Sequence, residues 1–124
     1  MMQNKSTHDK DERALLVQAI IGRRSRDEAA DSIAELERLA DTAGARVAGS
    51  ITQRRDRPDA GFFIGQGKLA EIQLACRASG ANLVIFDNEL SPVQVNNLDL
   101  AIGVKVIDRT ELILQIFARR ARTA

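Results

Sequence analysis

The sequence predicts a single α/β domain: a mostly parallel β-sheet with helices on both faces. Short apolar runs rich in Val, Ile and Leu alternate along the chain with amphipathic helical patterns. Three of the helical patterns end at a glycine that an apolar run follows closely, at Gly44, Gly80 and Gly103. Strands that alternate with helices imply right-handed βαβ units, and these place the helices over both faces of a parallel sheet. The length of 124 residues fits one such domain.

The first half of the chain contains a leader, two predicted strands and one helix. Residues 1–12 show no apolar periodicity and are predicted to be a disordered leader, followed by a domain over residues 13–124. The apolar run 13–21 (RALLVQAII) is typical of a buried parallel strand. Ser25 precedes Glu28 by three residues, a capping box that predicts a helix ending at Gly44. Residues 46–53 form the second predicted strand.

The second half repeats the pattern. A short extra strand is predicted at 62–64, then a helix that begins near Gly65 and ends at Gly80. Residues 81–87 (ANLVIFD) are the clearest strand. A capping box, Ser91 with Gln94, and a proline at the first helical position predict a helix to Gly103. A strand at 104–107 and a final helix, capped by Asp108 with Glu111, complete the domain.

The composition excludes several classes of protein. A lone cysteine, Cys76, and a lone histidine, His8 in the predicted leader, exclude a disulfide framework, a Cys-rich zinc site and His-centred catalysis. Cys76 falls on the apolar stripe of its helix and is expected in the core. The apolar runs are far shorter than the ~20 residues that span a bilayer, and no signal peptide is seen. We expect a cytoplasmic domain with no membrane partner.

A glycine-rich stretch, 61–69 (GFFIGQGKL), is the first candidate site. It fails the phosphate-loop pattern because Gly61 and Gly67 are one residue too far apart, and Leu69 occupies the position of the required hydroxyl. Gly65, Gly67 and Lys68 at a helix N-terminus can still hold an anion such as an RNA phosphate. The alternative is that the glycines serve only the turn into the helix.

Two aspartates, Asp87 and Asp108, follow predicted strands and form the second candidate site. The carboxyl ends of parallel strands share one edge, where two carboxylates can hold magnesium. A structural role is the preferred explanation for both, since Asp108 is a helix cap and Asp87 begins a turn. The mid-helix residues Asn96 and Asn97 have no clear role in the sequence.

The third candidate is the distribution of arginine, which supplies 14 of the 18 cations although the net charge is only +1. Three groups occur, in the two loops after the first two predicted strands and near the C-terminus. In a parallel sheet both loops emerge at the same edge, and guanidinium groups suit phosphate oxygens. The alternative is a pair of solvated loops. The three groups are Arg23, Arg24 and Arg26; Arg54, Arg55 and Arg57; and Arg119, Arg120 and Arg122.

Several stretches together resemble the N-terminal domain of the HflX family of ribosome-associated GTPases. The likeness extends over residues 13–123, although Phe63 stands where relatives often have tyrosine. The stretches that carry it are 52–59 (TQRRDRPD), 64–68 (IGQGK), 81–92 (ANLVIFDNELSP), 103–110 (GVKVIDRT) and 116–123 (IFARRART). The resemblance implies that this domain precedes a helical hairpin and a GTPase domain, neither of which is present in residues 1–124.

The resemblance implies a non-catalytic effector domain that contacts the large ribosomal subunit and its rRNA, with no DNA partner. GTP and magnesium are implied only for the GTPase domain, so no catalytic residue, metal site or cofactor is expected here. The expected phosphate-binding residues are Arg54, Arg55, Arg57, Gly65, Gly67 and Lys68. The alternatives are a small nucleotide-binding domain that uses the helix N-terminus at 65–68, and a fragment without independent activity that exposes an apolar face at Leu114.

Overall fold

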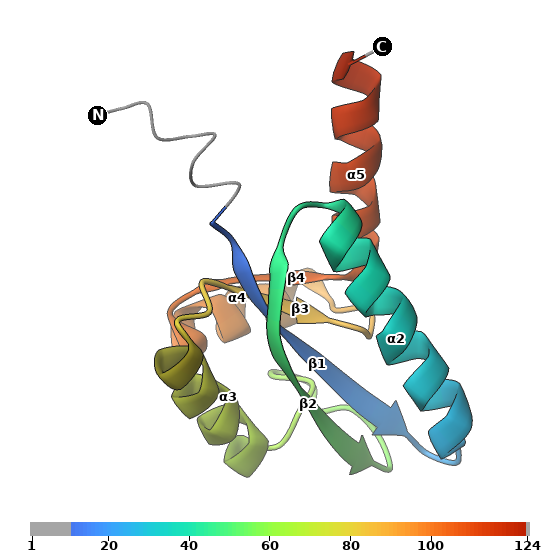
Figure 1. Cartoon of the computed structure of the whole chain (residues 1–124). Helices are drawn as coiled ribbons and strands as arrows, with labels where there is room; N and C mark the ends of the chain where they lie inside the picture. Colours follow the sequence, from blue (N-terminus) through green and yellow to red (C-terminus); the bar gives the residue numbers. More distant parts are fainter. Residues whose placement is uncertain (1–10, 124) are drawn as a thin grey trace.

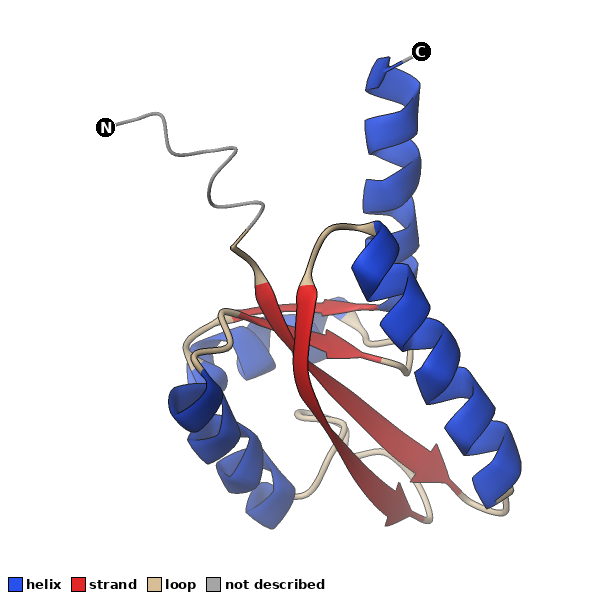
Figure 2. Cartoon of the chain, viewed as in Figure 1, coloured by secondary structure: helices blue, strands red, loops and turns tan. Residues whose placement is uncertain are grey.

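The computed structural model describes residues 11–123, with side chains as far as Arg119. Most of the predicted leader, including His8, lies outside the described residues. Strands and helices alternate along the chain (Figures 1 and 2). The elements are β1 (Arg13–Ile21), α2 (Arg26–Thr42), β2 (Arg46–Arg55), α3 (Gln66–Ser79), β3 (Leu83–Phe86), α4 (Pro92–Ile102), β4 (Lys105–Asp108) and α5 (Arg109–Thr123).

The sheet confirms the predicted fold class. Its four strands run in the order β2-β1-β3-β4, and every neighbouring pair is parallel. Helices α2 and α5 cover one face and α3 and α4 the other (Figure 1). The far end of α5 extends beyond the rest of the domain (Figure 2). No helix within residues 11–123 combines the length and the apolar character needed to cross a membrane.

The central strand β1 organises two hydrophobic cores. Its alternating side chains point to opposite faces of the sheet. Leu15 and Val17 pack beneath α3 and α4, whereas Leu16 packs beneath α2 and α5. Seven consecutive residues of β1, 14–20, are buried, which explains its near-continuous apolar sequence.

The predicted helix ends are confirmed. Ser25 and Ser91 each form a complete capping box with the residue three positions later. The Asp108 Oδ1 atom accepts a hydrogen bond from the Glu111 amide at 3.0 Å and so caps α5 as predicted. Gly103 ends α4 with a φ of 84°, a left-handed conformation that other residues rarely adopt.

Several predicted strand boundaries differ from the structure, including that of the last strand, which is Lys105–Asp108 and not 104–107. The expected strand at 62–64 is only an isolated antiparallel bridge between Asp59 and Phe63. The strand predicted at 81–87 is limited to Leu83–Phe86, because β3 pairs with both neighbours only over this stretch. The second strand continues beyond residue 53 to Arg55, because Arg54 and Arg55 remain paired with β1.

The buried centre of the sheet predicts a large cost for a cavity in β1. Leu16 is fully buried, and we expect Leu16→Ala to lower the free energy of unfolding by about 3 kcal/mol. Leu100→Ala is the matched control, since Leu100 is 78% exposed and should change stability little. Urea unfolding of both variants measures the difference, and similar losses would contradict the assigned core.

Candidate functional site

The carboxyl edge of the sheet holds a polar network where the strand order reverses. The chain moves from β1 outward to β2 and then returns past β1 to β3. Open α/β sheets commonly bind ligands at such a switch point, between the carboxyl ends of the two central strands. Asp87 directly follows β3 at this position, as the sequence predicts.

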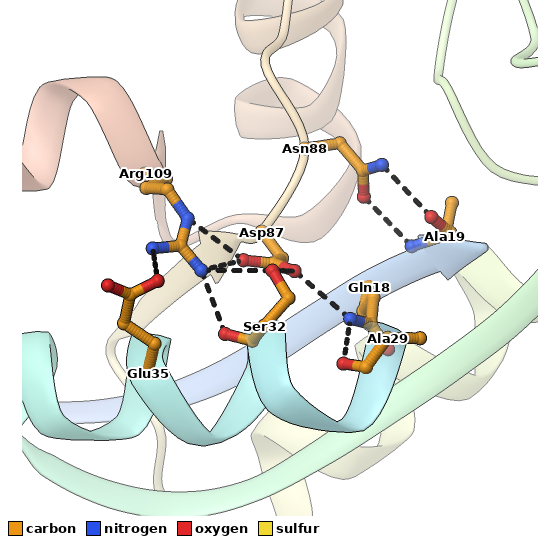
Figure 3. A network of polar contacts seen from close by, with 8 residues as sticks. All are labelled: Gln18, Ala19, Ala29, Ser32, Glu35, Asp87, Asn88 and Arg109. Carbon is orange, nitrogen blue, oxygen red and sulfur yellow. Dashed lines mark hydrogen bonds and ion pairs between the residues drawn. The ribbon is translucent and has the colours of Figure 1, made fainter. Parts of the chain in front are cut away.

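The Asp87 carboxylate is completely committed to neighbouring side chains (Figure 3). Its Oδ2 atom accepts hydrogen bonds from Gln18 Nε2 at 3.0 Å and from Ser32 Oγ at 2.7 Å. Its Oδ1 atom accepts from Nε and Nη2 of Arg109, and the side chain is only 1% exposed. These four bonds use the lone pairs that a metal ion would need. Asp87 therefore has a structural role, but its partners are distant side chains and not the backbone of the turn that the sequence predicted.

Asn88 closes the gap between β1 and the shorter β3. Its side-chain Oδ1 atom accepts from the Ala19 amide at 2.9 Å, while its Nδ2 atom donates to the Ala19 carbonyl at 2.9 Å (Figure 3). The side-chain amide thus continues the hydrogen bonding of β1 beyond the last residue of β3. Protein groups therefore fill the position where a doubly wound sheet usually receives its ligand.

The network alters the acidity of Asp87. Burial alone would raise the pKa of this carboxyl, but the hydrogen bonds from Ser32, Arg109 and Gln18 and the positive charge of Arg109 outweigh it. The resulting pKa lies below the ordinary value of 3.8. Asp87 is therefore a buried anion at neutral pH, and its charge is balanced by Arg109.

The carboxylate of Asp108 has hydrogen-bond partners of its own. One carboxylate oxygen caps α5, and the other accepts a hydrogen bond from the Leu90 amide at 2.9 Å. No group of three or more His, Cys, Asp or Glu side chains that could hold a metal ion occurs among residues 11–123. A magnesium site between Asp87 and Asp108 therefore has no support in the described part of the chain.

The arginines predicted to share the loop after β2 do not lie together. Arg54 and Arg55 belong to β2, paired with Ile20 and Ile21, so their side chains point to opposite faces of the sheet. Arg54 lies on the α2 side, where Nη1 donates to the Gly22 carbonyl at 2.8 Å and Nη2 to the Arg24 carbonyl at 2.9 Å. The prediction of one cluster was wrong because strand alternation separates neighbouring residues.

Arg55 lies on the α3 side of the sheet. Its Nε atom donates to the Arg57 carbonyl at 3.1 Å, which fixes the start of the following loop. A Cβ atom built on Gly65 would lie 2.7 Å from Arg55 Nη1, so glycine allows the guanidinium to approach the N-terminus of α3. Arg57 is exposed.

The N-terminus of α3 carries the remaining predicted residues. Gly65 is its N-cap, and the Gly65 amide donates to Gln53 Oε1 at 3.0 Å. Lys68 forms an ion pair with Glu71 at 2.9 Å, so its charge is partly balanced. A hollow of about 470 Å³ opens beside this helix end, lined in part by Arg55, Gly61 and Gly65. The structure thus brings Arg55 and Gly65 together and leaves Arg54 on the opposite face.

The loop between β2 and α3 is held by residues whose role the sequence did not reveal. Gln94 Nε2 donates to the Asp59 carbonyl at 2.9 Å, and Asn97 Nδ2 donates to the Gly61 carbonyl at 3.0 Å. Asn97 therefore fastens α4 to this loop, whereas Asn96 is exposed. Phe63 adopts a positive φ of 66° and anchors the loop against Phe86, with ring centroids 6.5 Å apart. An asparagine within a predicted helix was the only signal for this contact.

Cys76 is a core residue, as predicted. Its side chain is buried in the cluster beneath α3 and α4, and burial raises the pKa of the thiol. A thiol that is both buried and protonated is a poor nucleophile. Leu114 is 56% exposed, in agreement with its position off the main apolar stripe of α5.

Comparison with known proteins identifies the family. The family model described as "GTP-binding GTPase N-terminal" matches residues 30–118. The GTPase HflX of Caldanaerobacter subterraneus is 47% identical over 112 residues, which are 90% of this chain and 25% of that protein. The chain belongs to the N-terminal domain family of the HflX GTPases. The GTPase HflX of Escherichia coli is 42% identical over 94% of this chain and 26% of its own length.

A solved structure supports the fold of this HflX-type N-terminal domain. A GTP-binding protein from Sulfolobus solfataricus, in complex with GDP, matches 86% of this chain and 30% of its own, with a TM-score of 0.57 and 22% identity. At this identity the likeness extends to the fold alone. The chain spans about a quarter of the length of the HflX relatives described above.

The buried Asp87 predicts an acid-sensitive stability. Because its pKa is lowered by folding, the charged carboxylate stabilises the domain at neutral pH, and this contribution declines as the pH falls below 3.8. We expect Asp87→Asn to lower the free energy of unfolding by about 3 kcal/mol at pH 7. Urea unfolding of both proteins from pH 7 downward should show this difference shrinking in acid. A difference independent of pH would contradict the buried-anion assignment.

The two glycines of the α3 N-terminus should respond differently to alanine. A Cβ on Gly67 meets nothing within 4 Å, so Gly67→Ala should stabilise the domain by about 0.5 kcal/mol. Gly65→Ala should bring no such gain, because the new methyl group displaces Arg55 and alanine is a poor N-cap. Thermal unfolding of the two variants tests the order, and equal effects would show that Arg55 does not constrain Gly65.

Proposed function

We propose that this HflX-type domain is a non-catalytic module that contacts the rRNA of the large ribosomal subunit. The observation that supports the proposal is the concentration of arginines at the carboxyl ends of β1 and β2. Segments 22–28 and 54–57 carry six arginines and three carboxylates, whereas the whole chain has a net charge of only +1. The nitrogens of one guanidinium group can bind two phosphate oxygens at once, and clustered arginines suit the phosphate backbone of RNA.

The filled switch point supports a binding role for the domain rather than a catalytic one. Asp87 and Asn88 are both committed to partners within the domain, so neither is available to activate a substrate. The proposed contacts therefore lie around this crevice, at Arg54, Arg55, Arg57 and Lys68, with Gly65 and Gly67 at the adjoining helix end. No catalytic residue, metal or cofactor enters this mechanism.

The proposed role is that of one domain of a longer GTPase. The relatives carry the name GTPase HflX, and this chain corresponds to about a quarter of each. We assign GTP binding and hydrolysis to the part that residues 1–124 do not cover, and binding of the ribosome in the cytoplasm to this domain acting together with it. The domain boundaries at residues 13 and 124 belong to the same proposal.

Co-sedimentation with isolated large ribosomal subunits tests the proposal directly. We expect the purified chain to pellet with subunits at low salt and to be released as the salt rises, because contacts with phosphates displace condensed cations. The triple variant Arg54→Ala, Arg55→Ala, Arg57→Ala should lose most of this binding. Arg77→Ala is the matched control, since Arg77 is exposed in the last turn of α3, away from this edge. Absence of pelleting at low salt would indicate a folded fragment without independent affinity.

Nucleotide binding is the second candidate, favoured by the hollow of about 470 Å³ beside the α3 N-terminus. Helix N-termini bind phosphates through unpaired amides, and Arg55 lies at this one. Calorimetric titration with ATP and with GTP, each with magnesium, decides between the candidates. Micromolar binding that Arg55→Ala weakens would favour the nucleotide, whereas undetectable binding would exclude it.

A further inference from the structure

The two arginine-bearing loops at the carboxyl edge are joined by Arg54. This residue belongs to β2, yet both of its described side-chain hydrogen bonds reach the loop that follows β1. One bond is to the carbonyl of Gly22 and the other to the carbonyl of Arg24, at 2.8 and 2.9 Å. The backbone adds a further link, because the Gly22 amide donates to the Arg55 carbonyl at 2.8 Å. The loop after β1 is therefore positioned by the end of β2.

A guanidinium group is well suited to make both side-chain contacts at once. Its two terminal nitrogens lie in one rigid plane and donate in a fixed fork, whereas a lysine ammonium is a single point. The carbonyls of Gly22 and Arg24 are two residues apart, and the fork of Arg54 spans them. Gly22 turns the chain with a φ of 64°, so this loop makes a tight turn and is also held by the side chain of Arg54.

The hydrogen bonds of Arg54 to the loop after β1 leave other arginines exposed on the surface. Arg23 and Arg26 are exposed in the segment that Arg54 holds, and Arg57 is exposed just beyond β2. None of these three side chains takes part in an ion pair or side-chain hydrogen bond within the described part of the chain. Their charges are thus accessible from solvent at one edge of the sheet.

Nearby carboxylates only partly offset this charge. Glu28 is oriented towards the Ser25 amide by the capping box, and Asp27 lies in the same first turn of α2. Both carboxylates favour the helix N-terminus, where the partial charge of the helix is positive. Three carboxylates against six arginines leave the two segments clearly basic.

We infer that Arg54 is a positioning residue that joins the two loops into one RNA-binding ridge, whose phosphate contacts are made by Arg23, Arg26 and Arg57. The inference rests on the proposed function and refines it by adding Arg23 and Arg26. It also gives Arg54 a role through the loop rather than through direct contact. The ligand is the phosphodiester backbone of RNA, since exposed guanidinium groups held on a fixed surface match phosphate oxygens.

Filter binding to protein-free large-subunit rRNA over a salt series tests the ridge. We expect Arg23→Ala with Arg26→Ala to weaken binding about tenfold and to reduce the salt slope by about two, and Arg57→Ala to reduce it by about one. Arg54→Lys keeps its charge but should weaken binding about as much as Arg54→Ala. Arg38→Ala is the control, since Arg38 is exposed near the opposite end of α2.

Hydrogen exchange in the free protein separates a positioning role of Arg54 from direct contact with RNA, because loss of a direct contact alone would not change amide exchange. The Gly22 amide is protected by the Arg55 carbonyl, and we expect Arg54→Lys and Arg54→Ala to accelerate its exchange while Arg57→Ala leaves it unchanged. Parental rRNA binding by Arg54→Lys, or by the Arg23 and Arg26 double variant, would overturn the inference. Binding to protein-free rRNA that depends on the ridge, without binding to intact subunits, would instead refute the proposed function alone. Failure to bind either would overturn both.

Discussion

The buried ion pair between Asp87 and Arg109 determines how the elements meet at the carboxyl edge. Asp87 follows β3, Arg109 begins α5, and Ser32 and Glu35 of α2 bind the same guanidinium. Gln18 brings β1 into the network. One carboxylate therefore joins two strands and two helices. A buried charge is tolerated only where it is paired and fully hydrogen-bonded, so each partner has a restricted position.

This network also determines where a ligand can bind. In an open α/β sheet the switch point between β1 and β3 is the usual crevice, but here Asp87 and Asn88 fill it with internal hydrogen bonds. The order β2-β1-β3-β4 places the carboxyl ends of β1 and β2 side by side, on one flank of the crevice. The exposed side chains of Arg23, Arg26 and Arg57 lie there. The HflX-type domain thus separates a closed polar centre from an open basic edge.

Local chemistry explains why most of the fold could be predicted. The capping boxes at Ser25 and Ser91 and the left-handed glycines depend on a few adjacent residues, and the structure confirms them. The burial of β1 follows from its apolar run. The candidate site was harder to predict from the sequence. Arg54 and Arg55 are neighbours in sequence on opposite faces, and this was missed because the end of β2 was set two residues too early. Asn97 and Arg109 gave no local sign of their partners.

The α/β class, most of the elements and the helix caps follow from the sequence, because each depends on residues within a few positions. The HflX resemblance follows from several motifs spread over residues 52–123. The strand order, the pairing of Asp87 with Arg109 and the hydrogen bonds of Arg54 to the loop after β1 became visible only in the folded domain. The bond between Asp87 and Arg109 joins residues 22 positions apart, and the two bonds of Arg54 join residues 30 and 32 positions apart. Periodicity and capping contain no information about such partners, since the partners meet only when the whole sheet has packed.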